Sequence, residues 1–372
     1  MSMKENTIKT TKYKGANGSF IGRYNLLFVV VILFVACWLA NDAFVSAFSL
    51  LGVFKEIAVY GFLVLGVMPV ILTGGIDLSV ASMASFSSVV AAAFAKNMLD
   101  GEMPSPEWLV LIIMLVVPVA MTMTFGYISG TFVSRLRMPP LVVTLGMNWV
   151  TYGLALKVMK EFGAGAPIGF NFALGKSIFN TSIKLGGDKP FLSIPLVFIY
   201  LIIAVVVMAI VLKKLRWGRE IYATGGNEYA ARISGIKTGR VKRRVYMMSG
   251  FFAGLAGLSV MTTINGVGDP KACVGYELYA IAACVMGGTA LSGGKGNIVN
   301  AIFGMVCLRL LYKLILFAGM SNYSQNMIVG GIILLTLIIA TSDFGSVKGF
   351  FRKVLSGSTS KNENDKGADK NE

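Results

Sequence analysis

The sequence lacks histidine and is poor in charged residues and in paired cysteines. No histidine occurs among its 372 residues, which removes the usual general base and the commonest metal ligand. The four cysteines, Cys37, Cys273, Cys284 and Cys307, form no Cys-x-x-Cys pair, so neither a disulfide framework nor a zinc site is indicated. Charged residues make up only 14% of the chain, whereas a soluble domain has about 25%. We therefore exclude an ordinary soluble domain.

Apolar residues dominate instead. They make up 55% of the chain, and the mean hydropathy is +0.71. A membrane-spanning helix needs about 20 mostly apolar residues. The sequence predicts an all-α, polytopic membrane protein with about ten transmembrane helices. Their approximate ranges are 25–40, 55–73, 78–96, 108–130, 139–158, 191–213, 244–264, 275–291, 297–318 and 324–341.

The basic residues predict the orientation of these helices. With the N-terminus in the cytoplasm, 24 Lys and Arg residues fall on the inside and 8, including Lys55, on the outside. Such an excess on cytoplasmic segments is the usual bias of membrane proteins. We expect both termini to lie inside. The same bias accounts for the net charge of +16, and no separate basic domain points to nucleic acid.

The spans divide the chain into three parts. Residues 1–24 form a cytoplasmic tail, 25–345 the transmembrane domain and 346–372 a polar cytoplasmic tail that is expected to be disordered. Within the domain, residues 159–190 form an extracytoplasmic loop, and residues 214–243 form the most basic cytoplasmic loop.

An acidic residue lies between two apolar runs in "TGGIDLSVAS" (73–82). Gly74 and Gly75 can end one helix, and Asp77 can cap the next by accepting backbone N–H bonds. Alternatively, the turn lies at membrane depth and Asp77 lines the path of a transported solute. A similar "GGTALS" at 287–292 suggests that the fold uses one device twice, although a match this short also arises by chance.

A short helix is predicted in the basic cytoplasmic loop. In "NEYAARISGI", Asn227 can cap its start, Glu228 suits the positive end of the helix dipole, and Gly235 can end it. One face is small, with Ala230, Ala231 and Ser234. Such a helix can dock in a groove of another protein. The alternative is a solvated or lipid-surface loop.

Other polar residues fall within predicted spans. Arg309 and Lys313 lie one turn apart, and charge within a membrane suggests a functional site. The alternative is that both side chains extend to the membrane surface. Thr144 and Asn148 can bind a hydroxylated solute or pack helix against helix. Glu277 is either part of an outer gate or an acid at a helix N-terminus.

The chain has no ATPase motif. "GGTALSGGKGN" looks phosphate-binding, but a P-loop requires G-x-x-x-x-G-K-[ST]. Counting back from Lys295, Thr289 occupies the position of the first glycine, and Gly296 follows the lysine. We interpret this segment as a tight cytoplasmic turn.

Four motifs in order resemble the inner-membrane permeases of ABC sugar importers of the ribose, galactose and arabinose type, a family that includes autoinducer-2 and nucleoside permeases. The resemblance covers about residues 25–345. The motifs are "TGGIDLSVAS" (73–82), "PPLVVTLGM" (139–147), "GREIYATGGNEYAARISGI" (218–236) and "GYELYAIAACVMGGTALSGGKG" (275–296). Many members have Asp after "GYEL", where this chain has Tyr279.

The resemblance implies an ABC importer permease fold in the bacterial inner membrane and a path for a monosaccharide. It also implies a second permease subunit, identical or different, an extracytoplasmic binding protein and a cytoplasmic ATPase that uses ATP and Mg²⁺, with no cofactor bound by this chain. The residues that match the ATPase-coupling element are Gly226, Asn227, Glu228, Ala230, Ala231, Arg232, Ser234 and Gly235.

Two other functions remain open. A permease of this family can carry a nucleoside or an autoinducer-2-like solute. An ion-coupled secondary transporter is the alternative class, but it needs ionisable groups deep in several spans. The predicted spans offer few such groups, namely Asp77, Arg309 and Lys313.

Overall fold

The computed structural model describes residues 20–99, 105–169, 181–185 and 192–321, and a few single residues or pairs between 323 and 334. Most of the predicted N-terminal tail, the C-terminal tail and most of the tenth span lie outside this part of the chain. So does much of the predicted loop 159–190.

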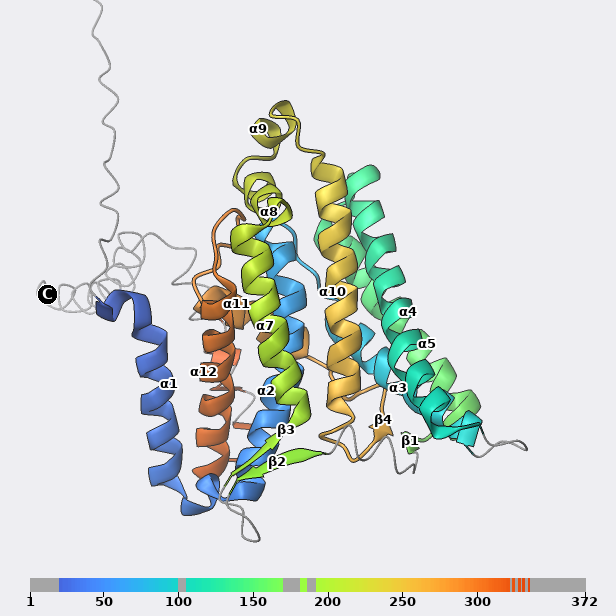
Figure 1. The fold of residues 1–372 in the computed structure, drawn as a ribbon, viewed down its shortest axis with the longest axis vertical. Helices are drawn as coiled ribbons and strands as arrows, with labels where there is room; N and C mark the ends of the chain where they lie inside the picture. Colours follow the sequence, from blue (N-terminus) through green and yellow to red (C-terminus); the bar gives the residue numbers. More distant parts are fainter. Residues whose placement is uncertain are drawn as a thin grey trace, which may run out of the picture.

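The described residues are mainly helical (Figure 1). Four short strands form two antiparallel pairs, β1 with β4 and β2 with β3. The helices are α1 (Phe20–Ala40), η1 (Asp42–Val45), α2 (Ala47–Leu72), α3 (Val80–Leu99), α4 (Glu107–Arg135), α5 (Pro140–Gly163), α7 (Leu196–Lys214), α8 (Arg216–Gly226), α9 (Glu228–Ile233), α10 (Thr238–Val260), α11 (Tyr276–Met286) and α12 (Ile298–Phe317). The strands are β1 (Ile168–Gly169), β2 (Ser182–Leu185), β3 (Leu192–Pro195) and β4 (Val267–Gly268).

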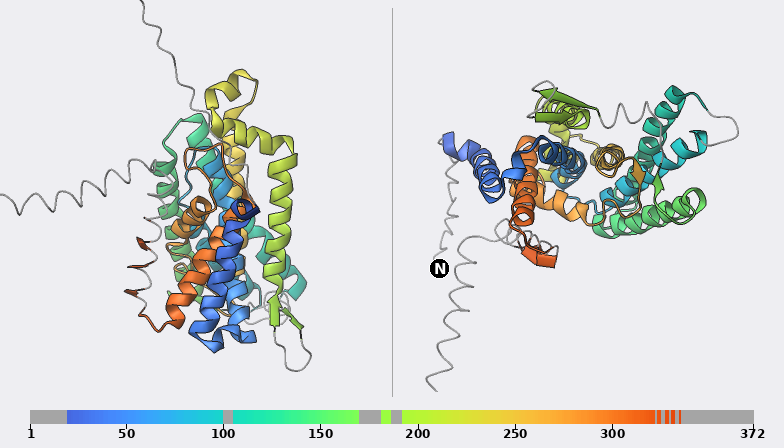
Figure 2. Two further views of the ribbon diagram at one scale, coloured as in Figure 1. Left: turned by 90° about the vertical axis from the view of Figure 1, so that its left-hand side faces the viewer. Right: turned by 90° about the horizontal axis from the view of Figure 1, so that it is seen from below.

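The long helices run roughly side by side between two different ends (Figure 1). One end bears α8 and α9 and is called here the α9 end. The other bears the strands and is called the strand end. Seen from the strand end, α1 and α12 lie on one side and α4 and α5 on the other, with α2 and α10 between them (Figure 2). Under the predicted topology, the α9 end faces the cytoplasm.

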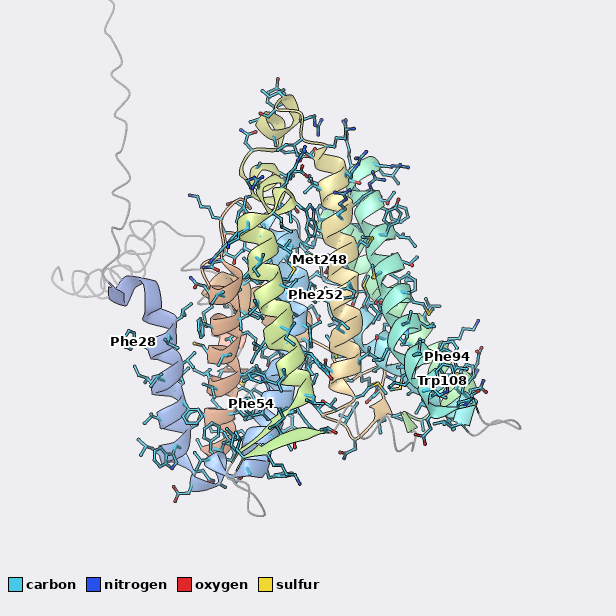
Figure 3. All side chains as sticks on the ribbon, in the orientation of Figure 1. Phe28, Phe54, Phe94, Trp108, Met248 and Phe252 are labelled. Atoms are coloured by element: carbon cyan, nitrogen blue, oxygen red, sulfur yellow. The ribbon has the colours of Figure 1, made fainter. Side chains whose placement is uncertain are left out.

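Burial separates central from peripheral helices. Fifteen of the twenty residues of α3 are buried, but only four of the nineteen in α7. The outer faces of α1, α4, α5 and α7 carry exposed apolar side chains such as Phe28 and Trp108 (Figure 3). Large exposed apolar surface of this kind is expected where lipid is the solvent.

Within the described residues, five helices are long and apolar enough to cross a membrane, namely α2, α4, α5, α7 and α12. The central helices α3 and α10 are less apolar because they pack mainly on other helices. A helix shielded from lipid can carry the serines of α3 and the basic first turns of α10.

Nine of the ten predicted ranges overlap helices of the described residues, and most of the tenth lies outside them. Two helix starts and one span differ from the prediction in an informative way. Helix α2 begins at Ala47 rather than at residue 55, so Lys55 is not in an outside loop. Helix α10 begins at Thr238 rather than at 244. The predicted span 275–291 is wrong as a full span, because α11 has only 11 residues and rises about 16 Å.

The residues before α11 are not helical, and several of them, including Gly268 and Cys273, are buried against α3. A Cβ on Gly268 would lie 2.7 Å from the carbonyl oxygen of Ser88, in the middle of α3. The Ser85 hydroxyl, also on α3, accepts the backbone N–H of Cys273 at 3.1 Å. Irregular backbone within a membrane domain is tolerated where protein surrounds it or where it lines a cavity. Segment 261–275 meets this condition.

The two similar Gly-Gly motifs adopt the same turn. Gly74 and Gly288 have φ angles of +76° and +80°, which glycine adopts without strain. The N–H of Gly75 donates to the Val70 carbonyl, and the N–H of Thr289 donates to the Cys284 carbonyl. Each pair spans five residues and closes a helix in the Schellman pattern. The same kind of helix-ending turn therefore occurs after α2 and α11, but it uses the first glycine of the motif at 74–79 and the second glycine of the motif at 287–292.

Candidate functional site

The predicted short helix between spans is present as α9 (Glu228–Ile233). The Asn227 side chain accepts the backbone N–H of Ala230 at 2.9 Å, and Gly235 follows the end of the helix with φ +84°. Asn227 and Gly235 therefore do what the sequence predicts. The structure adds α8, which was not predicted, so that segment 214–243 consists largely of helix.

The exposed face of α9 differs from the predicted small face. Ala231 is buried against the chain itself, although Ala230 and Ser234 are exposed. The large apolar side chains exposed on α9 are Tyr229 and Ile233, at 75% and 72% exposure. They lie four residues apart, on one side of the helix. Because α9 projects beyond the bundle (Figure 1), these two apolar side chains are presented away from the membrane-spanning helices.

One ion pair attaches α9 to the start of α10, and a second lies within α9. Glu228 accepts a 2.6 Å bond from Lys242 and a 3.4 Å bond from Arg232. Partial burial opposes ionisation of Glu228, but the bond and charge of Lys242 prevail and lower the pKa of Glu228 below its ordinary value. A helix of six residues would not be stable alone. Lys242 and the Asn227 cap therefore help to hold it in place.

Glycines bring α8 directly onto the turns that end α2 and follow α11. A Cβ on Gly225 would lie 1.7 Å from the Leu72 carbonyl oxygen and 2.7 Å from the Gly294 nitrogen. That oxygen accepts the Gly294 N–H at 2.9 Å. Tyr222, also on α8, donates its hydroxyl to the Gly296 carbonyl at 2.9 Å. We call the backbone contact of Leu72, Gly225 and Gly294 the glycine junction.

Asp77 follows the last residue of α2 by five positions and is completely buried. One carboxylate oxygen accepts the N–H and the hydroxyl of Ser79 at 2.9 and 2.6 Å, and the other accepts the Ser249 hydroxyl at 2.7 Å. Three donors thus satisfy the acid and tie the start of α3 to α10. These contacts support a structural role, although Ser79 rather than Asp77 accepts the first helical bond, from Met83.

Thr144 and Asn148 differ from each other in burial. Thr144 is fully buried, and its hydroxyl donates to the Pro140 carbonyl at 3.0 Å and lies 3.4 Å from that of Ile76. Its contacts are those of helix packing. Asn148 is half-buried. Glu277 is half-buried in the first turn of α11, and its carboxylate interacts with the Gly275 N–H, as an acid at a helix N-terminus should.

Arg309 and Lys313 share a carboxylate that the sequence analysis did not single out. Glu56 on α2 accepts from Arg309 through one oxygen and from Lys313, at 2.8 Å, through the other. The Arg309 side chain is 7% exposed and that of Lys313 is 15% exposed. Both side chains are therefore largely covered by protein. Glu56 was missed because Lys55 and Glu56 interrupt the apolar run, so that the predicted span began at residue 55 and both charges were placed at its outer end.

Tyrosines surround this charge cluster. The Arg309 guanidinium lies 4.4 Å from the ring centre of Tyr60 and 4.7 Å from that of Tyr312. Tyr60 also stacks on Tyr276 at 4.3 Å and meets Tyr279 edge-on at 5.7 Å. Together they line a cavity of about 590 Å³, which we call the tyrosine cavity.

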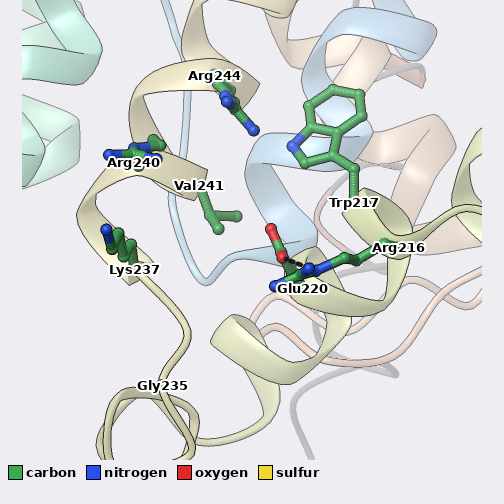
Figure 4. Close-up of a pocket in the computed structure, with 8 residues that line it drawn as sticks. All are labelled: Arg216, Trp217, Glu220, Gly235, Lys237, Arg240, Val241 and Arg244. Atoms are coloured by element: carbon green, nitrogen blue, oxygen red, sulfur yellow. Dashed lines mark hydrogen bonds and ion pairs between the residues drawn. The ribbon is translucent and has the colours of Figure 1, made fainter.

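A second cavity, of about 480 Å³, lies at the α9 end (Figure 4). Four basic side chains line it, and Arg216 is the one that forms an ion pair with a described residue, Glu220, at 2.9 Å. The Trp217 indole is also in its wall, and none of the described residues accepts its buried N–H. The cavity makes this end of the molecule strongly positive. The other basic residues are Lys237, Arg240 and Arg244.

Comparisons with known proteins agree on one family. Residues 49–337 match the family described as branched-chain amino acid transport system / permease component. The chain is 33% identical to the ribose import permease protein of Bacillus subtilis over 87% of this chain and 91% of that protein. It is 32% identical to the ribose import permease protein of Haemophilus influenzae (89% and 96%). It is 29% identical to the galactose/methyl galactoside import permease protein of Escherichia coli (87% and 95%). The search of solved structures found no significant match.

Proposed function

This chain belongs to the sugar permeases of ABC importers, within the branched-chain amino acid transport system / permease component family, and we propose that its solute is a monosaccharide of the ribose or galactose kind. It is a multi-pass transport subunit of the bacterial inner membrane and not an enzyme, because a separate ATPase hydrolyses ATP in such importers. The observation that carries the function is the similarity to sugar permeases along almost the whole chain.

The family implies two partners, an ATPase and an extracytoplasmic solute-binding protein. In our proposal the working unit also contains a second permease subunit. The ATPase supplies ATP and Mg²⁺ chemistry at its own site, and this chain binds no cofactor.

The ATPase docks on α9 in this proposal, through Tyr229 and Ile233. Their exposure supports the assignment, because two large apolar side chains on a projecting helix are suited to a groove in a partner. The positive cavity beside α8 favours an acidic rim around that groove. The glycine junction continues the contact from α8 to the ends of α2 and α11, so that movement of the ATPase reaches the spans.

Reconstitution tests the function. The permease, its ATPase and its binding protein are placed in proteoliposomes, and ATP-dependent uptake of labelled ribose and galactose is measured. Tyr229→Ala/Ile233→Ala is expected to lower uptake at least tenfold and to release the ATPase in pull-downs. Tyr323→Ala, an exposed tyrosine outside α9, is the control and should leave both unchanged.

Two results would contradict the proposal. Sugar uptake by this chain alone, abolished by an uncoupler, would indicate an ion-coupled transporter. ATP-dependent uptake of nucleosides in place of sugars would keep the family but change the solute.

A further inference from the structure

We propose that the tyrosine cavity is a binding site for a single carbohydrate molecule, held through an acceptor oxygen on Arg309 and through ring stacking on tyrosines. This inference rests on the proposed sugar transport and gives it a place in the chain. The cavity lies among α2, α11 and α12, and the residues that define it are Glu56, Tyr60, Tyr276, Tyr279, Arg309 and Tyr312.

The first observation is a buried donor without an acceptor. Arg309 is 6% exposed, and no acceptor among the described residues lies within hydrogen-bonding distance of its Nε–H. Leaving a buried donor of a charged group unpaired costs about 1–3 kcal/mol or more. Glu56 satisfies another nitrogen of the same guanidinium. A hydroxyl or carboxylate oxygen of a solute in the cavity would supply the missing acceptor.

The second observation is the aromatic wall. Tyr60 is buried, with 4% exposure, and forms the back of the cluster, whereas Tyr276, Tyr279 and Tyr312 are partly exposed. A tyrosine ring offers an apolar face and a polar tip. A sugar ring needs both, because its C–H faces are apolar and its hydroxyls project from the edge.

The third observation is the charge balance. Arg309 and Lys313 share the single carboxylate of Glu56, so this cluster carries one positive charge in excess. The net positive charge repels metal ions and organic cations. The hydrogen-bond donors of Arg309 and Lys313 favour solutes rich in acceptor oxygens. Two carbohydrate sources satisfy this chemistry. A neutral sugar presents a hydroxyl oxygen to Arg309, and a sugar acid presents a carboxylate.

Size and position agree with a solute site. A volume of about 590 Å³ falls in the usual range of about 300–1,000 Å³ for small-molecule sites. Thr263, Val274 and Gly275 of the non-helical segment 261–275 also line the cavity. Transporters commonly place solute sites where helices are interrupted within the membrane.

The test measures binding directly. The permease is placed in lipid nanodiscs, and saturation-transfer NMR records transfer of magnetisation to galactose and to galacturonate. Arg309→Lys keeps a positive charge but removes Nε–H, and we expect about tenfold weaker binding. Tyr279→Ala removes part of the wall and should also weaken binding severalfold. Trp149→Ala removes an exposed aromatic residue of α5 outside the cavity and should bind as the unmodified protein does.

The outcomes separate the inference from the proposed function. Preference for galacturonate identifies a carboxylate on Arg309, and preference for galactose identifies a hydroxyl; both support the site. Equal transfer to the sugars from all four proteins, or none from the unmodified one, overturns it. Uptake by the complete importer is measured alongside. If the unmodified importer carries sugar and Arg309→Lys and Tyr279→Ala carry it with unchanged kinetics, the cavity is not the site but the function stands. Tyr279→Phe keeps the aromatic ring in the cavity wall and should bind nearly as the unmodified protein does. Loss of binding in this variant as well would indicate that substitution at position 279 disturbs folding.

Discussion

The glycine junction predicts opposite effects for two neighbouring substitutions in α8. In Gly225→Ala, the new Cβ would lie 1.7 Å from the Leu72 carbonyl oxygen, half of the ordinary 3.4 Å separation, and 2.7 Å from the Gly294 nitrogen. Both obstacles are backbone atoms, so no side-chain rotation relieves the overlap. In Gly226→Ala, the new Cβ meets nothing within 4 Å.

The magnitude follows from what must move. Overpacking of a rigid contact costs about 1–3 kcal/mol, and separating Leu72 from Gly294 breaks their 2.9 Å hydrogen bond, a loss of about 1 kcal/mol. We expect Gly225→Ala to lower the free energy of unfolding by roughly 2–4 kcal/mol. Gly226→Ala should be neutral or stabilising by up to about 1 kcal/mol, because alanine restricts the unfolded chain more than glycine does.

Thermal unfolding of the two purified variants in the same detergent measures the difference. Gly225→Ala should unfold several degrees below the unmodified protein, and Gly226→Ala at or above it. ATP-dependent uptake by the complete importer then shows whether displacement of α8 also weakens coupling. Equal unfolding temperatures for the two variants would refute the close approach of α8 to the ends of α2 and α11.

Three further predictions concern Asp77, α9 and the cysteines. Asp77→Asn should lower the free energy of unfolding by about 1 kcal/mol and keep uptake, since the Ser249 hydroxyl can reorient. Asp77→Ala should lower it by roughly 2 kcal/mol more, because buried donors lose their acceptor. A stable Asp77→Asn protein without uptake would instead place Asp77 in the path. The pKa of Glu228 is lowered in the folded state, so its contribution is complete above pH about 4.5 and is lost as pH falls through the lower folded value. Being partly exposed, the pair with Lys242 contributes less than about 1 kcal/mol; proteolysis near α9 should rise at low pH, and Lys242→Met should remove that dependence. The four native cysteines are buried, so a membrane-impermeant maleimide should label the protein only after Tyr229→Cys adds an exposed thiol on α9. This variant should be labelled in inside-out vesicles. Labelling in right-side-out vesicles would contradict the predicted orientation.

Short sequence patterns were sufficient to predict features that depend only on neighbouring residues. Asn227 and Gly235 predicted the start and end of α9 because capping depends on a few neighbouring residues. The Gly-Gly motifs likewise predicted two helix ends, since φ angles near +80° favour glycine. Long apolar runs predicted most spans. The same reasoning misplaced the start of α2, because Lys55 and Glu56 interrupt the apolar run although the helix continues through them.

The composition and the order of motifs determined by themselves that this is a polytopic membrane protein and a sugar permease of an ABC importer. Hydropathy and short-range capping are properties of contiguous residues. Only the tertiary structure decided which charges meet. Glu56 and Arg309 are separated by 253 residues, yet they form one ion pair. Tertiary packing also buried Ala231, left Tyr229 and Ile233 exposed, and brought Leu72, Gly225 and Gly294 into backbone contact. These outcomes depend on how separate helices pack, which local sequence patterns do not encode.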